Sequence, residues 1–218
     1  MSLHHSHHAE FVRLGRPASW TGGIPASWAT ALIDYEGGPL PTSTITRADL
    51  RAFCRSPDTT PEACFVACMA WGMMRGKNRR LSWEQRHLWV PIVERLREGG
   101  ISREAAYALF HEADIPGLRT AFFTKLIFFL RPNPDGYILD QWTAKSVSLL
   151  FVPQFITINR DGWVTPANDA NVYRRYCEIV EHLAQVGVED ATVIEEKMFA
   201  GGRKVQPWRQ YVREHWRR

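Results

Sequence analysis

The sequence predicts an all-α fold, and three observations carry that prediction. Alternation of apolar and polar residues, which is typical of strands, is nearly absent. Apolar residues recur at helical spacing in successive segments. Capping residues precede these segments, and Gly or Pro residues end them. Hydrophobic residues make up 45% of the 218 residues, which is enough for a sizeable core. We expect about nine or ten helices and no internal repeat.

The N-terminal segment is expected to have little structure. Residues 1–23 contain Gly, Ser, Pro and His and are predicted to form a flexible tail. Four histidines form a cluster that is typical of a tag or a disordered tail rather than a metal site: His4, His5, His7 and His8. No change of composition divides the remaining residues, 24–218, so a single helical domain is predicted there.

Clear start signals define the helices of the first half. Thr46 is a good N-cap, and Pro61 fits the first turn of a helix that is apolar on most of its surface. Ser82-Trp83-Glu84-Gln85 is typical of a capping box, and Gly99-Gly100 ends the helix that follows it. Pro91 is expected to kink that helix. The predicted helices are 25–35, 47–55, 62–75 and a segment that ends near residue 98.

The second half carries similar signals. Ser102 is predicted to cap one helix, Asp140 another, and Asn168 or Asp169 a third. Ile115-Pro116-Gly117-Leu118 predicts a tight turn. The predicted helices are 102–111, 119–130, 140–151, 169–185, 189–199 and one from residue 207 to near the terminus. Residues 152–167 form a connection that is expected to include a short extended piece at 154–158.

Charge and cysteine content limit the function classes. The net charge of +4 is mildly basic, which agrees with an acidic partner such as nucleic acid. There is no CxxC and no Cys/His set at zinc spacing, so we expect reduced, buried thiols at Cys54, Cys64, Cys68 and Cys177. No signal-peptide segment and no apolar run of about 18 residues is present. The sequence therefore predicts a soluble, cytoplasmic protein with no membrane partner.

One lysine lies in an otherwise apolar run. Lys125 is the only charged residue of 121–130, and Asp140 follows at the end of a second apolar stretch, 137–139. An ammonium group in apolar surroundings loses solvation, which lowers its pKa and makes the neutral amine available as a nucleophile. A nearby carboxylate can exchange protons and stabilise a cationic intermediate. The pair predicts chemistry at an electrophilic sugar carbon.

A helix-turn-helix pair leads to this lysine. Residues 102–130 place Pro116 and Gly117 in the turn between two predicted helices. Glycine lets the backbone approach a ligand closely, and the N-terminus of the next helix presents free N–H groups. A DNA phosphate is the natural partner of such a turn.

Together these residues resemble the helix-hairpin-helix DNA glycosylases. Residues 121–126 (Ala-Phe-Phe-Thr-Lys-Leu) and 138–144 (Ile-Leu-Asp-Gln-Trp-Thr-Ala) are similar to a bacterial branch of 8-oxoguanine DNA glycosylase (OGG)-fold proteins, some of which occur beside antiphage signalling systems. Softer similarity extends to 70–72, 173–184 and 198–202. The resemblance implies that Lys125 is the catalytic lysine, which attacks the sugar C1′, and that Asp140 is the catalytic aspartate.

The hairpin departs from the family pattern. It reads Gly117-Leu118-Arg119 where the family usually has Gly-x-Gly, so Arg119 is expected to contact phosphate by charge. The expected DNA-binding residues of the hairpin and its second helix are Pro116, Gly117, Arg119 and Thr124. The cysteine spacing of the iron–sulfur relatives is absent, so we expect no cluster and no other cofactor.

Other basic and aromatic residues supply further candidates. A basic cluster in an expected loop is a candidate phosphate site, with a solvated loop as the alternative: Arg75, Lys77, Arg79 and Arg80. One face of the last helix carries three arginines that face either DNA or water: Arg209, Arg213 and Arg217. The candidates for a pocket that receives an extruded base are Trp71, Phe122, Gln141 and Trp142.

The predicted function is excision of an oxidised or modified purine such as 8-oxoguanine from DNA. The reaction proceeds through a Lys125 Schiff base assisted by Asp140, and β-elimination is a further step that makes such an enzyme a lyase as well. Two alternatives stay open. In the first alternative, the protein is a DNA-binding module without turnover. In the second, it is an accessory that recognises a modified nucleobase in an antiphage defence operon, and the other operon components are its partners.

Overall fold

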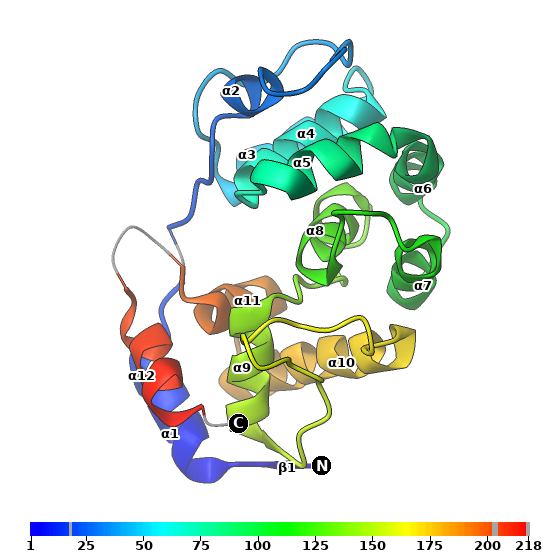
Figure 1. Ribbon diagram of the computed structural model, residues 1–218. Helices are drawn as coiled ribbons and strands as arrows, with labels where there is room; N and C mark the ends of the chain where they lie inside the picture. The colour runs from blue at the N-terminus through cyan, green and yellow to red at the C-terminus, as the bar shows by residue number, and fades with distance from the viewer. Residues whose placement is uncertain (18, 202–204, 217–218) are drawn as a thin grey trace. The chain divides into compact units, whose positions relative to one another are not determined.

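The computed structural model confirms the all-α prediction (Figure 1). It describes residues 1–17, 19–201 and 205–216, and within these ranges it has twelve helices and a single two-stranded sheet. Contacts divide the chain into two compact units. The terminal unit comprises Met1–Trp20 and Tyr137–Arg218, and the central unit comprises Thr21–Gly136. No helix in the described ranges is long and apolar enough to cross a membrane.

The central unit is built around two apolar helices, α4 and α8. Its helices are α2 (Pro25–Ala29), α3 (Arg47–Arg55), α4 (Pro61–Trp71), α5 (Gly76–Glu84), α6 (Arg86–Glu98), α7 (Arg103–Ala113) and α8 (Thr120–Leu130). Every residue of α4 from Ala63 onward is buried, and α4 packs on α2, α3, α6 and α8. Helix α8 is buried from Phe123 to its end and also contacts α3, α6 and α7. The core of this unit therefore forms around the two least polar segments of the sequence.

Side-chain caps fix several helix starts where the sequence predicts them. Thr46 Oγ1 accepts a hydrogen bond from Asp49 N at 3.2 Å, and Ser102 Oγ accepts one from Ala105 N at 3.1 Å. Helix α4 begins after Thr60, whose hydroxyl accepts from Ala63 N. These caps satisfy backbone N–H groups that the first turn of a helix leaves unpaired.

The segment around Ser82 differs from the prediction. Residues 76–84 form α5 rather than a basic loop, so the predicted capping box is wrong. Ser82 is fully buried inside α5, where its hydroxyl donates to Asn78 O at 2.8 Å. The physical reason is tertiary packing, because Trp83 is buried against Trp89 with ring centroids 6.0 Å apart. Burial of that side chain outweighs the low helix propensity of Gly76 and Asn78.

The terminal unit combines the two ends of the chain. Its elements are β1 (Ser2–Leu3), α1 (His5–Leu14), α9 (Gln141–Leu150), β2 (Phe151–Val152), α10 (Ala170–Gly187), α11 (Ala191–Phe199) and α12 (Pro207–His215). Helix α9 contacts α1, α11 and α12, and α10 packs on α11. In the connection after β2, the expected extended piece is reduced to an isolated bridge between Ile158 and Val164.

The prediction of little structure at the N-terminus is wrong for residues 2–14. β1 pairs antiparallel with β2, and α1 packs on α12. Phe11 is 3% exposed and lies edge-on to Trp208, with ring centroids 5.0 Å apart. His7 Nδ1 lies 2.8 Å from the Tyr211 hydroxyl. Composition does not predict this structure, because the segment is held by contacts with distant residues, such as that of Phe11 with Trp208.

The four cysteines are free and buried, as predicted. Three of them belong to the central unit, where Cys54 Sγ lies 3.7 Å from Cys68 Sγ and Cys64 Sγ donates to Cys54 O at 3.5 Å. Burial raises the pKa of the Cys54 and Cys68 thiols. The pKa of the Cys64 thiol is raised by its contact with Cys54 and then by burial.

The raised thiol pKa values predict that stability falls in alkaline solution. An unfolded thiol loses its proton near about pH 8.5, whereas the folded thiol keeps it, so above that pH the unfolded state binds fewer protons. The free energy of unfolding should then decrease by up to about 1.4 kcal/mol per pH unit for each thiol. Urea unfolding between about pH 7 and pH 10 measures this loss. Cys68→Ala should show a smaller loss, and identical losses in the two proteins would contradict the assignment.

Candidate functional site

Lys125 lies in the middle of α8, and its ammonium group points back toward the start of that helix. The side chain is 6% exposed. Nζ donates to Ala121 O at 2.5 Å and lies 5.5 Å from the centroid of the Phe122 ring. Both contacts belong to the first turn of α8, in the direction that helical side chains favour. The amine is therefore held at the end of α8 where the turn from α7 arrives.

Gly72 makes room for the stem of this lysine. A Cβ on Gly72 would lie 2.8 Å from Cδ and 3.0 Å from Cε of Lys125. Gly72 has a φ of −76°, which any residue adopts, so the requirement is steric rather than conformational. Sequence reasoning gave Gly72 no role. The available signal was its position directly after the buried Trp71 at the end of an apolar helix.

The turn between α7 and α8, residues 115–119, rests on α5. Leu118 N donates to Ile115 O at 3.0 Å, which closes the turn. Gly117 has a φ of +84°, and a Cβ there would lie 2.5 Å from Asn78 O. Both the left-handed backbone and the contact with α5 require glycine at this position. Through that contact, the turn lies beside the basic residues that flank Asn78.

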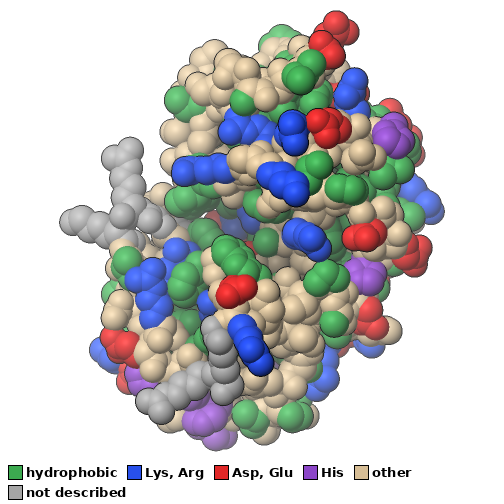
Figure 2. All heavy atoms as spheres, in the orientation of Figure 1, with side chains coloured by type: hydrophobic (Ala, Val, Ile, Leu, Met, Phe, Trp, Pro, Cys, Tyr) green, Lys and Arg blue, Asp and Glu red, His purple; other side chains and the backbone are tan. Residues whose placement is uncertain are grey.

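Basic side chains form a surface of the central unit beside α5 and the α7–α8 turn, which is called the basic surface. Figure 2 shows Lys and Arg side chains gathered over the region where α5 lies in Figure 1. Arg75, Lys77 and Arg119 are exposed, and none of them forms an ion pair with a described residue. Arg80 is also exposed, but it lies 3.7 Å from Glu84. Arg79 is half-buried, because it donates to Trp28 O at 3.0 Å and its guanidinium lies over the Trp28 ring.

The start of α8 adds backbone donors to this surface. Arg119 is the N-cap residue, and no side chain caps the helix there. Unpaired N–H groups and the positive end of the helix dipole favour an anion at such a place. With Pro116 exposed and Gly117 in the turn, the arrangement is suited to a DNA phosphate.

Two predicted site residues of the central unit lie in its interior. Thr124 is fully buried, and its hydroxyl donates to Thr120 O at 2.7 Å, so its side chain does not reach the surface where a DNA contact was predicted. Trp71 is 2% exposed and packs edge-on against Phe129, with ring centroids 5.0 Å apart. Its ring helps to build the core around α4 and α8. Phe122 is half-buried beside Lys125.

Asp140 opens α9 in the terminal unit and confirms the predicted N-cap. Its Oδ1 accepts hydrogen bonds from Trp142 N at 2.7 Å and Thr143 N at 3.1 Å, while Asp140 N donates to Thr143 Oγ1 at 2.9 Å. Oδ2 forms no hydrogen bond with a described residue, and the side chain is 7% exposed. One carboxylate oxygen thus fixes the orientation, and the other remains available for chemistry.

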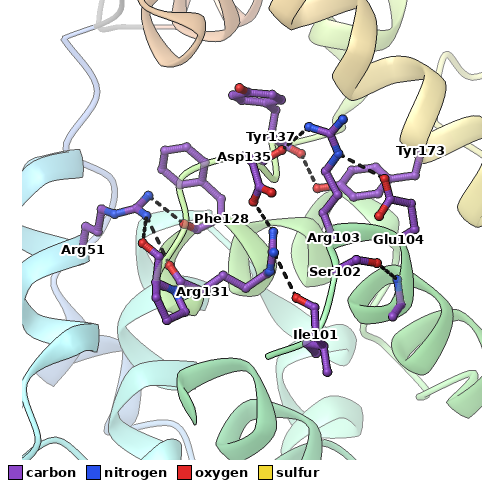
Figure 3. Close-up of polar contacts among 12 residues, drawn as sticks. Arg51, Ile101, Ser102, Arg103, Glu104, Phe128, Arg131, Asp135, Tyr137 and Tyr173 are labelled. Carbon is purple, nitrogen blue, oxygen red and sulfur yellow. Dashed lines mark hydrogen bonds and ion pairs between the residues drawn. The ribbon is translucent and has the colours of Figure 1, made fainter. Parts of the chain in front are cut away.

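Two tyrosines of α10 hold the segment that precedes Asp140. The Tyr173 hydroxyl donates to Tyr137 O at 2.9 Å, as Figure 3 shows, and the Tyr176 hydroxyl donates to Ile138 O at 2.7 Å. Both tyrosine side chains are fully buried, and burial raises the pKa of Tyr176. The start of α9 is therefore positioned by α10 as well as by its own capping box.

In the central unit, an arginine network fixes the end of α8 and the loop at 131–136 (Figure 3). Arg51 donates to Phe128 O at 3.0 Å and to Arg131 O at 3.2 Å. The buried Arg131 pairs with Asp135 and also donates to Ile101 O at 3.0 Å. Arg103 donates to Asp135 O at 2.8 Å. These contacts define where the chain leaves α8 beyond Lys125.

The remaining candidates belong to the terminal unit. Gln141 and Trp142 are half-buried in the first turn of α9. The Trp142 ring, which the sequence suggested for a base pocket, is surrounded by the side chains of Arg209, Lys145 and Arg213. Sequence reasoning missed Lys145, whose signal was its position three residues after Trp142 on one helix. Arg217 and Gly202 lie outside the described residues.

The structure brings the candidates together in two groups. Lys125 and Phe122 lie in the central unit with the α7–α8 turn and the basic surface, whereas Asp140, Gln141 and Trp142 lie in the terminal unit. Among the residues that the structure describes, no group of three or more His, Cys, Asp or Glu side chains is arranged to hold a metal ion.

Comparison with known proteins identifies the family. The sequence model described as "OGG: Putative 8-oxoguanine DNA glycosylase OGG-like protein" matches residues 8–199. That match contains Lys125, Asp140, the α7–α8 turn and the basic surface. A search of curated proteins and a search of solved structures each gave no match. Because the family model covers most of its length, the chain belongs to the OGG-like family that this model describes.

Proposed function

We propose that the protein removes an oxidised or modified purine, such as 8-oxoguanine, from DNA, with Lys125 as the nucleophile and Asp140 as the assisting carboxylate. The observation that carries the proposal is the placement of Lys125. Its head is buried at the end of α8 that faces the α7–α8 turn, and its stem fills the space that Gly72 leaves. An amine held in this place can attack an electrophilic carbon once it is neutral.

In the proposed reaction, the central unit holds the DNA backbone as a helix-hairpin-helix does. The α7–α8 turn, the start of α8 and the exposed Arg75, Lys77 and Arg119 contact phosphates, and the damaged nucleotide is extruded from the stack. Phosphate contacts set the position of the strand without reading its sequence. Recognition of the base itself falls to the pocket that receives it.

The chemical step joins the lysine to the sugar. The neutral Lys125 amine attacks C1′, and the bond from C1′ to the base breaks, with its electron pair and a proton leaving with the base. Ring opening then gives a Schiff base between Nζ and C1′, with the ring oxygen protonated. The Asp140 carboxylate stabilises positive charge at C1′ and transfers the protons. Loss of a C2′ proton and of the 3′ phosphate completes β-elimination.

Borohydride trapping tests this function, because borohydride reduces a Schiff base to a stable amine. The protein is incubated with duplexes that carry 8-oxoguanine, an abasic site or normal guanine. We expect a covalent adduct on the 8-oxoguanine duplex. An adduct on the abasic duplex alone would support the Schiff-base chemistry and indicate that the protein removes a base other than 8-oxoguanine. DNA binding without an adduct on any duplex would favour the non-catalytic alternative.

Gly72→Ala is expected to slow adduct formation by about 10- to 100-fold, because displacement of a reacting group by about 1 Å has effects of that size. The new methyl group would collide with the Lys125 stem while the backbone conformation stays allowed. Single-turnover trapping measures the rate. Gly187→Ala on α10 is the matched control, since its Cβ would meet no atom closer than 3.7 Å. Equal rates in both variants would show that Gly72 does not position Lys125.

A further inference from the structure

Three cationic side chains converge on one indole in the terminal unit. The Arg209 guanidinium lies 4.5 Å, the Lys145 ammonium 4.9 Å and the Arg213 guanidinium 5.5 Å from the centroid of the Trp142 ring. Lys145 also lies 4.8 Å from the centroid of the Trp216 ring. Trp142 and Lys145 come from α9, and the two arginines come from α12. These five residues are called the Trp142 cluster.

Like charges in this cluster repel one another, and at Arg209 the attraction of Asp140 exceeds the repulsion of Arg213. Burial and the charge of Arg213 lower the pKa of Arg209, whereas Asp140 raises it. Arg209 donates to Phe199 O at 2.6 Å and stacks on the Phe199 ring, which fixes its position. Arg213 is exposed and forms neither a hydrogen bond nor an ion pair with a described residue. The indole attracts each cation, but it does not remove the repulsion between them.

We propose that the Trp142 cluster binds a phosphate of the DNA strand that carries the lesion and anchors the terminal unit to DNA. An anion between these cations relieves their repulsion, and a guanidinium fork matches phosphate oxygens. Trp142 is the second residue of α9, and Asp140 is the residue that caps this helix. A phosphate held by the cluster therefore lies close to the nucleotide on which Asp140 acts. This inference rests on the proposed function.

The dependence of DNA affinity on salt provides the first test. The probe is a duplex with one 8-oxoguanine on a 2′-fluorinated sugar, which resists base release, so that only binding is measured. Arg213→Gln is expected to reduce the slope of log affinity against log salt by about one. Between about 50 and 200 mM salt, the variant should therefore lose about fourfold less affinity than the parent protein. Arg174→Gln is the matched control. Arg174 is an exposed cation of the same unit, paired with Glu178 at 2.9 Å, and its removal should leave the slope unchanged.

Neutral phosphates locate the contact. One phosphate at a time on the lesion strand is replaced by an uncharged methylphosphonate. At one position within about two nucleotides of the lesion, the replacement should weaken binding of the parent protein severalfold and leave binding of Arg213→Gln unchanged. Lys145→Gln serves as the second variant and should lose sensitivity at the same position.

Two results would overturn the proposal. One is an equal change of salt slope in Arg213→Gln and Arg174→Gln, and the other is equal sensitivity of parent and Arg213→Gln at every methylphosphonate. Because the probe is not turned over, these results are independent of Schiff-base formation. Failure of the glycosylase proposal would appear as absence of a trapped adduct, and failure of this inference as absence of a slope difference.

Discussion

The Lys125→Gln protein is expected to form no borohydride-trapped adduct on any duplex and to retain the DNA affinity of the parent protein. An amide nitrogen is not a nucleophile toward C1′, so the covalent step should slow by at least about 10³-fold. Glutamine keeps a polar head and fills part of the space against Gly72. The exposed phosphate contacts at Arg75, Lys77 and Arg119 are unchanged. Single-turnover trapping and a gel-shift titration measure the two properties separately.

Lys77→Gln is the matched control for this prediction. It removes the same functional group from the basic surface, where the side chain is exposed. We expect weaker binding and, at saturating protein, an undiminished rate of adduct formation. Peptide mapping of the adduct of the parent protein identifies the attached residue directly. An adduct on any amine other than Lys125, or a full-rate adduct in Lys125→Gln, would assign the chemistry elsewhere.

Local signals in the sequence were sufficient for most helices. The N-caps at Thr46, Ser102, Asp140 and Asp169 all hold, because a cap is an interaction between residues two or three apart. Helices α1 and α5 were missed for the opposite reason. Their stability comes from contacts with distant residues. In α1, Phe11 packs against Trp208, and in α5, Trp83 Nε1 donates to Ile33 O at 2.9 Å. Composition and capping rules carry no information about such pairs.

The same distinction applies to the candidate site. Lys125 was visible because a single charge in an apolar helix is a local anomaly. The roles of Gly72 and Gly117 were not visible, because each depends on a neighbour in the folded unit. Gly72 lies against the stem of Lys125, and Gly117 lies against the backbone of Asn78. The Trp142 cluster likewise needs α9 and α12 together.

Asp140→Asn is expected to slow base release by about 10²- to 10³-fold while the thermal midpoint falls less than it does in Asp140→Ala. Asparagine caps a helix as well as aspartate does, so the hydrogen bonds to Trp142 N and Thr143 N should persist. What is lost is the negative charge and the proton-accepting Oδ2. Asp140→Ala loses both functions. It should be equally slow and also less stable by about 1 kcal/mol, which corresponds to about 2 to 4 °C for a chain of this size.

Asp169 allows the cap to be separated from the chemistry. Its side chain caps α10 by accepting from Val172 N at 2.9 Å, and it is exposed. Asp169→Ala should therefore lose about as much stability as Asp140→Ala and release base at the parent rate. If Asp140→Asn also released base at the parent rate, Asp140 would be an N-cap alone, as Asp169 is. If Asp140→Asn were slow and lost less stability than Asp140→Ala, the carboxylate that caps α9 would also serve the reaction. One of its oxygens would then cap the helix, and the other would take part in the chemistry.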